Sequence, residues 1–540
     1  MGIKKLTSWL RPYRVSKPTH AFADGVMFID GHSMAHVVAR HGNRGAMYDW
    51  RAVSLTMENL MNRWIAEGWN IEMILFDGLT PKPKMGEISR RTRERIQEAS
   101  RSNTLSLAAG CSNVCYATLV NKYPKVNCKI STEESDDIVA SMVFNYAASH
   151  RDTTIYLLSS DSDFCAFDFP DNVVLVNPHQ ASRDRYDSIS LAKQLREKTM
   201  LPPSAVAYAI KIGSEPSEST LTDPYYVKFA TDQMKKLTAH SIATHKEYVA
   251  DAGMMESYKL LGGDLKIDPA AHRVINGLRA SNESYMMMPI MCEPPEAEFA
   301  FDAGRRWRSL AYEIIAQKAG GKDMFFNEIG RKHAERHEYK VPMTDGAREK
   351  NDGLEEYKYG TRESITREVK SWKTKEDLVN AIYDEVALTT PVGEGLLKYS
   401  PEIAKAQALT YLTEIVNSVG KRRREIFWSE RGKPMSGTML RMYNKFLTCV
   451  MSLRLLEAAG FQHPIKLELY DMDAARYRQI VTEVSSPTHK KIDVRKGSPP
   501  RKNGGKNYRS NRSRSTTPEA PKDKVDADAL ADQVSRVQIS

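Results

Sequence analysis

The sequence predicts an α/β fold: a mainly parallel sheet flanked by helices, followed by a mostly α-helical region and a disordered basic tail. Three observations support this. Short apolar, β-branched runs alternate with helical patterns up to about residue 240. Helical periodicity dominates after that point. Beyond Ser485 the chain is rich in Ser, Pro, Gly, Asn and Arg and has almost no large apolar residues.

The first part alternates strand and helix patterns in chain order. Strands are expected at 25–30, 71–76, 153–158 and 173–176. Helices are expected at 50–68, 84–98, 134–150 and 188–198. Such alternation is typical of a parallel sheet, because each crossover between parallel strands needs a covering helix. Further helices are expected at 307–318, 402–419 and 438–459.

The chain has 540 residues, which is too long for one core of ordinary size. We expect an α/β domain at 1–235, a mostly helical region at 240–485 and a disordered tail at 486–540. The net charge is +10, and it is uneven: residues 487–518 hold ten Lys and Arg against one acid, Asp493. The positive excess therefore lies mostly in the tail.

Several classes of protein are excluded by the sequence. No apolar run reaches about 18 residues, so no membrane contact is expected. The opening MGIKKLTSWL is too short an apolar segment for a signal peptide, which predicts a cytoplasmic or nuclear protein that is not secreted. The six cysteines form no CxxC pair, so neither a zinc site nor a disulfide framework is expected.

Acidic residues recur where predicted strands end and where one predicted helix begins. They are Asp30; Asp77; Glu134, Asp136 and Asp137; and Asp161 with Asp163. Singly, each has a simpler explanation as a turn or a helix cap. Together, at one edge of a parallel sheet, they would repel one another unless cations offset them. We therefore expect two Mg²⁺ or Mn²⁺ ions and in-line phosphodiester hydrolysis.

The order of several short motifs resembles the flap endonuclease and XPG-type family of structure-specific 5′-nucleases, within the PIN-like superfamily. The likeness covers about residues 1–220. The motifs are Met1-Gly2-Ile3-Lys4-Lys5-Leu6, Ile29-Asp30, Phe76-Asp77-Gly78 with Lys84, Gly86, Glu87 and Arg91 in register, the ESDDIVA of Glu134 to Ala140, the SDSDFC of Ser160 to Cys165, and the IGSE of Ile212 to Glu215.

The resemblance implies a PIN-like fold and a role for each matching residue. Metal ions would be held by Asp30, Asp77, Glu134, Asp136, Asp137, Asp161, Asp163 and Glu215. Lys84 and Arg91 would clamp the scissile phosphate. Gly2 and His36 would lie against the nucleic acid. Glu215 replaces the aspartate of the family pattern.

Two departures from the family bear on the substrate. Few residues separate Arg95 from Glu134, so the arch that threads flaps is expected to be short. The residues after Glu215 read PSESTLTDPYYVKF and lack the glycine pattern of a duplex-gripping helix–turn–helix. Together with the RKNGGKNYRSNRSRS tail, these features favour RNA slightly over DNA as the partner.

Two alternatives remain open. One is a nucleic-acid-binding or mRNA-decay scaffold that has a nuclease-like fold and little activity. The other is a flap or structure-specific DNA endonuclease of repair or replication. In each case the helical region at 240–485 is a candidate surface for protein partners.

Overall fold

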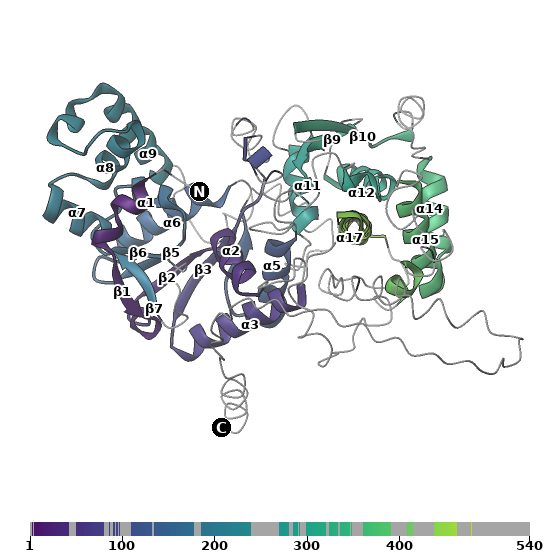
Figure 1. Ribbon diagram of the computed structural model, residues 1–540, viewed down its shortest axis with the longest axis horizontal. Helices are drawn as coiled ribbons and strands as arrows, with labels where there is room; N and C mark the ends of the chain where they lie inside the picture. Colours follow the sequence, from purple (N-terminus) through teal and green to yellow (C-terminus); the bar gives the residue numbers. More distant parts are fainter. Residues whose placement is uncertain are drawn as a thin grey trace, which may run out of the picture. The chain divides into compact units, whose positions relative to one another are not determined.

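The structure is a computed structural model of the chain (Figure 1). It describes most of residues 3–42, 50–79, 110–177, 185–238, 269–345, 360–389 and 437–461, with isolated positions between them. The chain divides into two units, Met1–Ser486 and Pro487–Ser540. The described residues all belong to the first unit, so the predicted basic tail lies outside them.

A seven-stranded sheet forms the first half of the chain, in the order β1-β7-β6-β5-β2-β3-β4. Its strands are β1 (Val15–Pro18), β2 (Val26–Asp30), β3 (Asn70–Phe76), β4 (Cys128–Ile130), β5 (Ile155–Leu158), β6 (Val173–Asn177) and β7 (Arg185–Ile189). Strands β6, β5, β2, β3 and β4 run parallel to one another. Strands β7 and β1 are antiparallel additions at one edge. The predicted mainly parallel sheet is thus confirmed.

Each face of this sheet is covered by helices, because alternate residues of its central strands are buried on opposite sides. Met27 and Ile29 belong to one hydrophobic cluster, and Val26 and Phe28 to another. The first cluster includes α2 (Gly31–Gly42), α3 (Trp50–Ala66) and α5 (Cys111–Lys122). The second includes α1 (Leu6–Trp9), α6 (Ser135–Ser149), α7 (Leu191–Thr199), α8 (Pro203–Ile212) and α9 (Pro224–Thr238). The result is a three-layer α/β/α arrangement (Figure 1).

The predicted strands at 25–30, 71–76, 153–158 and 173–176 correspond to β2, β3, β5 and β6. The predicted helices at 50–68 and 134–150 correspond to α3 and α6. The segment expected to be helical at 188–198 instead begins as the end of β7 and continues as α7. Most of the predicted helix at 84–98 lies outside the described residues.

The second half is mostly helical in its described residues, and it also holds a small sheet that the sequence did not predict. The helices are α11 (Pro269–Arg279), α12 (Arg305–Ala319), α14 (Arg362–Ser371), α15 (Lys375–Leu388) and α17 (Gly437–Ala458). The sheet has the order β10-β9-β8, from β8 (Tyr285–Met287), β9 (Phe325–Lys332) and β10 (Glu335–Pro342). Short 3₁₀ helices occur at η1 (Arg11–Tyr13), η2 (Thr19–Phe22), η4 (Ser162–Ala166), η5 (Glu218–Thr222) and η6 (Ala300–Asp302). None of the described helices is long and apolar enough to cross a membrane.

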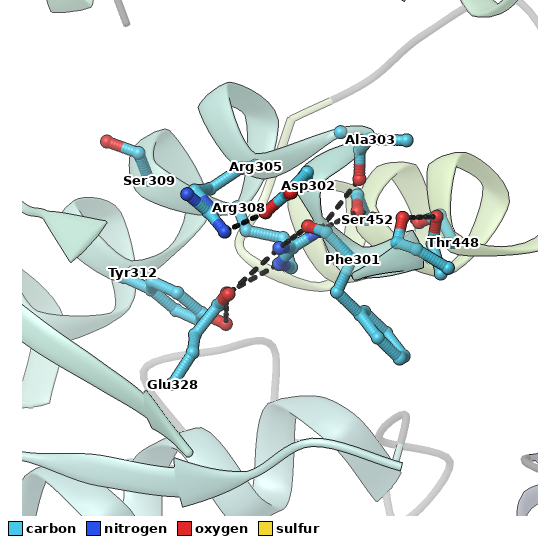
Figure 2. A network of polar contacts seen from close by, with 12 residues as sticks. Phe301, Asp302, Ala303, Arg305, Arg308, Ser309, Tyr312, Glu328, Thr448 and Ser452 are labelled. Atoms are coloured by element: carbon cyan, nitrogen blue, oxygen red, sulfur yellow. Dashed lines mark hydrogen bonds and ion pairs between the residues drawn. The ribbon is translucent and has the colours of Figure 1, made fainter. Parts of the chain in front are cut away.

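A buried ion pair organises the core of this second half (Figure 2). Arg308 of α12 donates through Nε to Glu328 of β9 at 2.6 Å, and the two side chains are 3% and 0% exposed. Tyr312 donates its hydroxyl to the same carboxylate at 2.7 Å. Arg308 also donates to Ser452 of α17 at 2.8 Å. Because a buried charge is costly unless fully paired, this network fixes α12, β9 and α17 in one arrangement.

One hydrophobic cluster includes residues of both halves. It joins Val114 of α5 and Phe76 of β3 to Ile275 of α11 and Trp307 of α12. The helices that cover one face of the first sheet are therefore packed in the same core as helices more than 150 residues further along the chain. This shared core places α11 beside the loop that follows β3.

Candidate active site

Asp30 ends β2 and lies against the first turn of α2. Its Oδ1 accepts the main-chain N–H groups of His32 and Ser33, both at 3.0 Å, and its Oδ2 accepts the hydroxyl of Ser159 at 2.7 Å. The side chain is 3% exposed. Burial, and next the negative charge of Asp77, raise the pKa of Asp30 to about 7, although its hydrogen bonds oppose the shift. Proton uptake by this carboxyl near neutral pH reflects a site that is short of positive charge.

Gly31 allows these elements to approach closely. A Cβ atom at this position would lie 2.7 Å from the ring of Phe76 and 2.9 Å from the main-chain oxygen of Leu75. The start of α2 can therefore pack directly on the end of β3, where Asp77 follows. Only glycine fits this contact without displacing the strand.

Asp77 follows β3 and is held by Ser135 at the start of α6. Its Oδ1 accepts both the main-chain N–H of Ser135 at 2.9 Å and the hydroxyl at 2.6 Å. His32 Nδ1 lies 3.5 Å from the other oxygen, an ion-pair distance when the imidazole is protonated. Burial by itself would raise the pKa of Asp77, but His32, Ser135 and Arg273 together lower it. Asp77 thus keeps its charge more readily than Asp30 or Asp136.

Glu134 and Asp136 lie at the N-terminal end of α6. Glu134 is the N-cap residue and Asp136 is in the first turn. Burial, and then the charges of Asp30, Asp77, Asp161 and Glu134, raise the pKa of Asp136 well above its ordinary value. These carboxylates are therefore close enough to repel one another.

Asp161 follows β5 and caps η4 by accepting the main-chain N–H of Asp163 at 2.9 Å. Its own N–H donates to the Ser159 hydroxyl at 3.0 Å, and the same hydroxyl donates to Asp30. Ser159 therefore links the end of β2 to the end of β5. Ser33 and Ser160 add a second link, through a short contact between their hydroxyls.

Five of the predicted metal ligands lie close enough to influence one another's charge: Asp30, Asp77, Glu134, Asp136 and Asp161. The other three are placed differently. Asp137 pairs with Lys236 of α9 at 3.0 Å. Asp163 is exposed beyond its capping contact. Glu215 is exposed in the segment after α8.

The remaining predicted site residues are only partly described. Gly2 and Lys84 lie outside the described residues. Arg91 is described and half-buried. His36 is buried in α2, 9% exposed, with its ring 5.5 Å from that of His32.

The chemistry of the acidic residues suits a divalent cation. Within the described part of the chain, no group of three or more His, Cys, Asp or Glu side chains is gathered as a ready ligand set. Even so, the donors are carboxylate oxygens, the ligands preferred by Mg²⁺ and Mn²⁺. The raised pKa values of Asp30 and Asp136 show that added positive charge would stabilise the ionised site.

The second half of the chain contacts this site through α11. His272 Nε2 lies 3.0 Å from the main-chain oxygen of Ser131, and burial, reinforced by the neighbouring Arg273 charge, lowers the pKa of His272 to about 4. The neutral ring must carry its proton on Nε2, because a carbonyl oxygen can only accept. Arg273 donates to the main-chain oxygen of Asp77 at 3.5 Å and to Asn113 at 3.3 Å. Leu79, two residues after Asp77, packs with Tyr285 and Ile329 of the small sheet.

Sequence reasoning did not identify these supporting residues. The serines were visible beside the acids, in ESDD and SSDSD, but a serine next to an aspartate has many ordinary roles. His32 falls one turn before His36 on α2. Arg273 had no local signal at all, because its contact with Asp77 spans 196 positions.

Comparisons with known proteins gave no matching family model and no matching curated protein. Solved structures with partial likeness include the catalytic core of Rad2 with a DNA substrate, at 12% identity and a TM-score of 0.28, covering 43% of this chain and 68% of that one. A second Rad2 catalytic-core structure has 13% identity and a TM-score of 0.27 over 46% and 82%. Human GEN1 with Holliday junction DNA has 14% identity and a TM-score of 0.27 over 45% and 57%. Each likeness is partial and at low identity, so function is inferred below from the chain's own residues.

Proposed function

We propose that this protein is a divalent-metal-dependent nuclease that hydrolyses nucleic-acid phosphodiester bonds. The observation that carries the proposal is the mutual repulsion of Asp30, Asp77, Glu134, Asp136 and Asp161, which lie at the ends of parallel strands and at the start of α6. A protein gains nothing in stability from burying such charges. Their retention at one edge of the sheet is explained by a cationic cofactor and the chemistry it supports.

Asp30, Asp77, Glu134, Asp136 and Asp161 would hold two Mg²⁺ or Mn²⁺ ions, which would supply an activated water and stabilise charge on the scissile phosphate. The chain's own residues orient these ligands. Ser159 and the N–H groups of α2 fix both oxygens of Asp30. Ser135 fixes one oxygen of Asp77 and leaves the other facing His32.

Lys84 and Arg91 are the proposed cations on the scissile phosphate, where they would stabilise the charge that develops in the transition state. The proposed substrate is RNA rather than DNA. Its support is the basic, serine- and arginine-rich tail and the absence of a glycine-rich duplex grip after Glu215. A DNA flap endonuclease is the alternative within the same chemistry.

Asp136 and Asp137 provide a matched test, because they are neighbours in one helical turn with opposite surroundings. Asp136→Asn should lower cleavage by more than about 100-fold, because it removes a ligand and not merely a supporting contact. Asp137→Asn should stay within about threefold of wild type, because its ion pair with Lys236 is half-exposed and worth at most about 1 kcal/mol. Substrates would be single-stranded RNA, structured RNA, single-stranded DNA and flap DNA, each with Mg²⁺ or Mn²⁺.

The same panel separates the alternatives. Preferential cutting of flap DNA would identify a structure-specific DNA endonuclease. If wild-type protein binds these substrates but cuts none with either metal, the scaffold function replaces the nuclease. Equal losses in both variants, with unchanged unfolding temperatures, would contradict the assignment of Asp136 and Asp137 to different roles.

A further inference from the structure

A small pocket opens beside Asp161, between the N-terminal segment and the strands β5, β6 and β7. Its polar lining includes Thr7, Arg14, Ser160, Asp161, Asn177 and Asp187. Asp161 belongs both to this pocket and to the acidic site. Whatever occupies the pocket therefore lies next to the proposed point of cleavage.

Asp187 is more than nine-tenths buried, at 8% exposed, and it lines this pocket from β7. It is paired in register with Asn177 of β6 and Ser16 of β1. Among the residues that the structure describes, none gives the Asp187 carboxylate a hydrogen bond or an ion pair. Its oxygens are therefore available to a hydrogen-bond donor that enters the pocket.

Arg14 lines the same pocket and likewise has no side-chain hydrogen bond or ion pair within the described part of the chain. Its positive charge opposes the rise in the pKa of Cys165 of η4, so the guanidinium lies near that thiol. Arg14 and Asp187 have opposite charges, yet no ion pair joins them. The pocket thus offers an anion-binding group and a hydrogen-bond acceptor at separate points.

A bare metal ion does not suit this lining, because Arg14 would repel it. A nucleotide of a single strand does suit it. Its phosphate matches a guanidinium, and its sugar hydroxyl matches a buried carboxylate. The 2′-hydroxyl is the donor that distinguishes RNA from DNA.

The geometry points to a ribonucleotide subsite, in which Arg14 contacts a backbone phosphate and Asp187 accepts the 2′-hydroxyl of the nucleotide next to the cleaved bond. This inference rests on the proposed nuclease function and assigns it a sugar specificity. Deoxyribose would leave the Asp187 carboxylate without that donor. A site that is built to bond a hydroxyl rejects the analogue that lacks it far more strongly than an apolar pocket rejects a missing methylene.

The test compares binding first, so that it does not depend on cleavage. Full-length protein in chelator is titrated with RNA and DNA single strands of one sequence. Wild type should bind RNA more tightly, and Asp187→Ala should lower the RNA-to-DNA affinity ratio roughly tenfold or more through loss on RNA alone. Asp152→Ala is the control, because Asp152 is exposed in the turn before β5 and does not line the pocket.

Arg14→Ala should weaken the binding of RNA and the binding of DNA equally. It should also reduce the slope of log affinity against log salt by about 0.7, the value for one phosphate contact on a single strand. Thermal unfolding would show that each variant is folded. Equal binding of RNA and DNA by wild type, or an unchanged ratio in folded Asp187→Ala, overturns the subsite.

Cleavage is measured second, on RNA carrying a single 2′-deoxy substitution at successive positions. One substitution next to the cleaved bond should slow wild type and leave Asp187→Ala unaffected. Wild-type protein that cuts nothing but keeps the Asp187-dependent binding ratio would refute the nuclease and retain the subsite. Cleavage that does not depend on Asp187 would support the nuclease and refute the subsite.

Discussion

Arg273 of α11 donates to the main-chain oxygen of Asp77 at 3.5 Å, a contact that joins residues 196 positions apart. Its guanidinium also contacts Asn113 of α5 and helps to lower the pKa of Asp77. The second half of the chain therefore contributes directly to the environment of the acidic site. Arg273 is a positioning residue, because it acts on Asp77 and not on the reacting atoms.

Arg273→Ala is expected to lower kcat roughly 10- to 100-fold, with little change in KM, because residues that orient metal ligands typically have effects of this size. Arg273→Lys should recover part of the loss, since it restores the charge but not both contacts. The Mn²⁺ concentration for half-maximal activity should change in Arg273→Ala and return toward wild type in Arg273→Lys. Arg367→Ala, which breaks an exposed ion pair on α14, serves as the control. Activity of Arg273→Ala within twofold of wild type would contradict this role.

His272 should make stability depend on pH. Its pKa is about 4 in the folded protein, against an ordinary 6.5, because the ring is buried. The unfolded chain therefore binds more protons between these values, and the stabilising effect of neutral His272, present above pH 6.5, is lost as the pH falls toward 4. The loss is on the order of 3 kcal/mol.

The test of this pH dependence is His272→Gln, whose amide can still donate to Ser131 but cannot titrate. Urea unfolding of both proteins from pH 4 to 7 gives the free energy of unfolding as a function of pH. Subtracting one curve from the other cancels the contributions of the other groups. A wild-type curve parallel to that of His272→Gln would show that folding does not lower the pKa of His272, contrary to expectation.

Asp30 should have the opposite effect on stability. Its pKa is raised from 3.8 to about 7, so the folded protein binds more protons between these values and loses stability as the pH rises through them. Above pH 7 the ionised carboxylate costs on the order of 4 kcal/mol when no cation is present. Asp30→Asn should therefore stabilise the metal-free protein at pH 8 while abolishing cleavage.

Calorimetry checks both parts of that prediction. Mn²⁺ should raise the unfolding temperature of wild type and have a much smaller effect on Asp30→Asn, because binding to the folded state alone stabilises it by mass action. Asp152→Asn, an exposed control, should respond to Mn²⁺ as wild type does. An Asp30→Asn protein that is less stable than wild type at pH 8 would show that Asp30 is mainly a structural cap.

The central sheet was predictable because β2, β5 and β6 are almost wholly buried, as is the second half of β3, and these residues form apolar runs. The edge strands of the sheet were not predictable from the sequence. Strand β1 has the sequence VSKP and β7 has RYDSI, and neither has the apolar continuity of a central strand. The small sheet was missed for the same reason, since β10 is ERHEYKVP. Edge strands are set by pairing with neighbours, which a local pattern does not record.

The candidate site was likewise predictable only in part. Acids at the ends of parallel strands were expected to meet, and Asp30, Asp77 and Asp161 lie near one another. Which acid of the ESDD segment faces them was not predictable, because adjacent helical residues point about 100° apart and the pattern does not fix the rotation. Asp137 instead forms an ion pair with Lys236, which is nearly a hundred positions away along the chain.

The core shared by α5, α11 and α12 also constrains how this sequence can change over evolutionary time. A substitution that shifts α11 would move the contacts of His272 and Arg273, and with them the loop that holds Asp77. Selection on the chemistry of the first half therefore extends to packing residues of the second. Paired changes between Leu79 and its neighbours Tyr285 and Ile329 are where such co-variation should be sought in homologues.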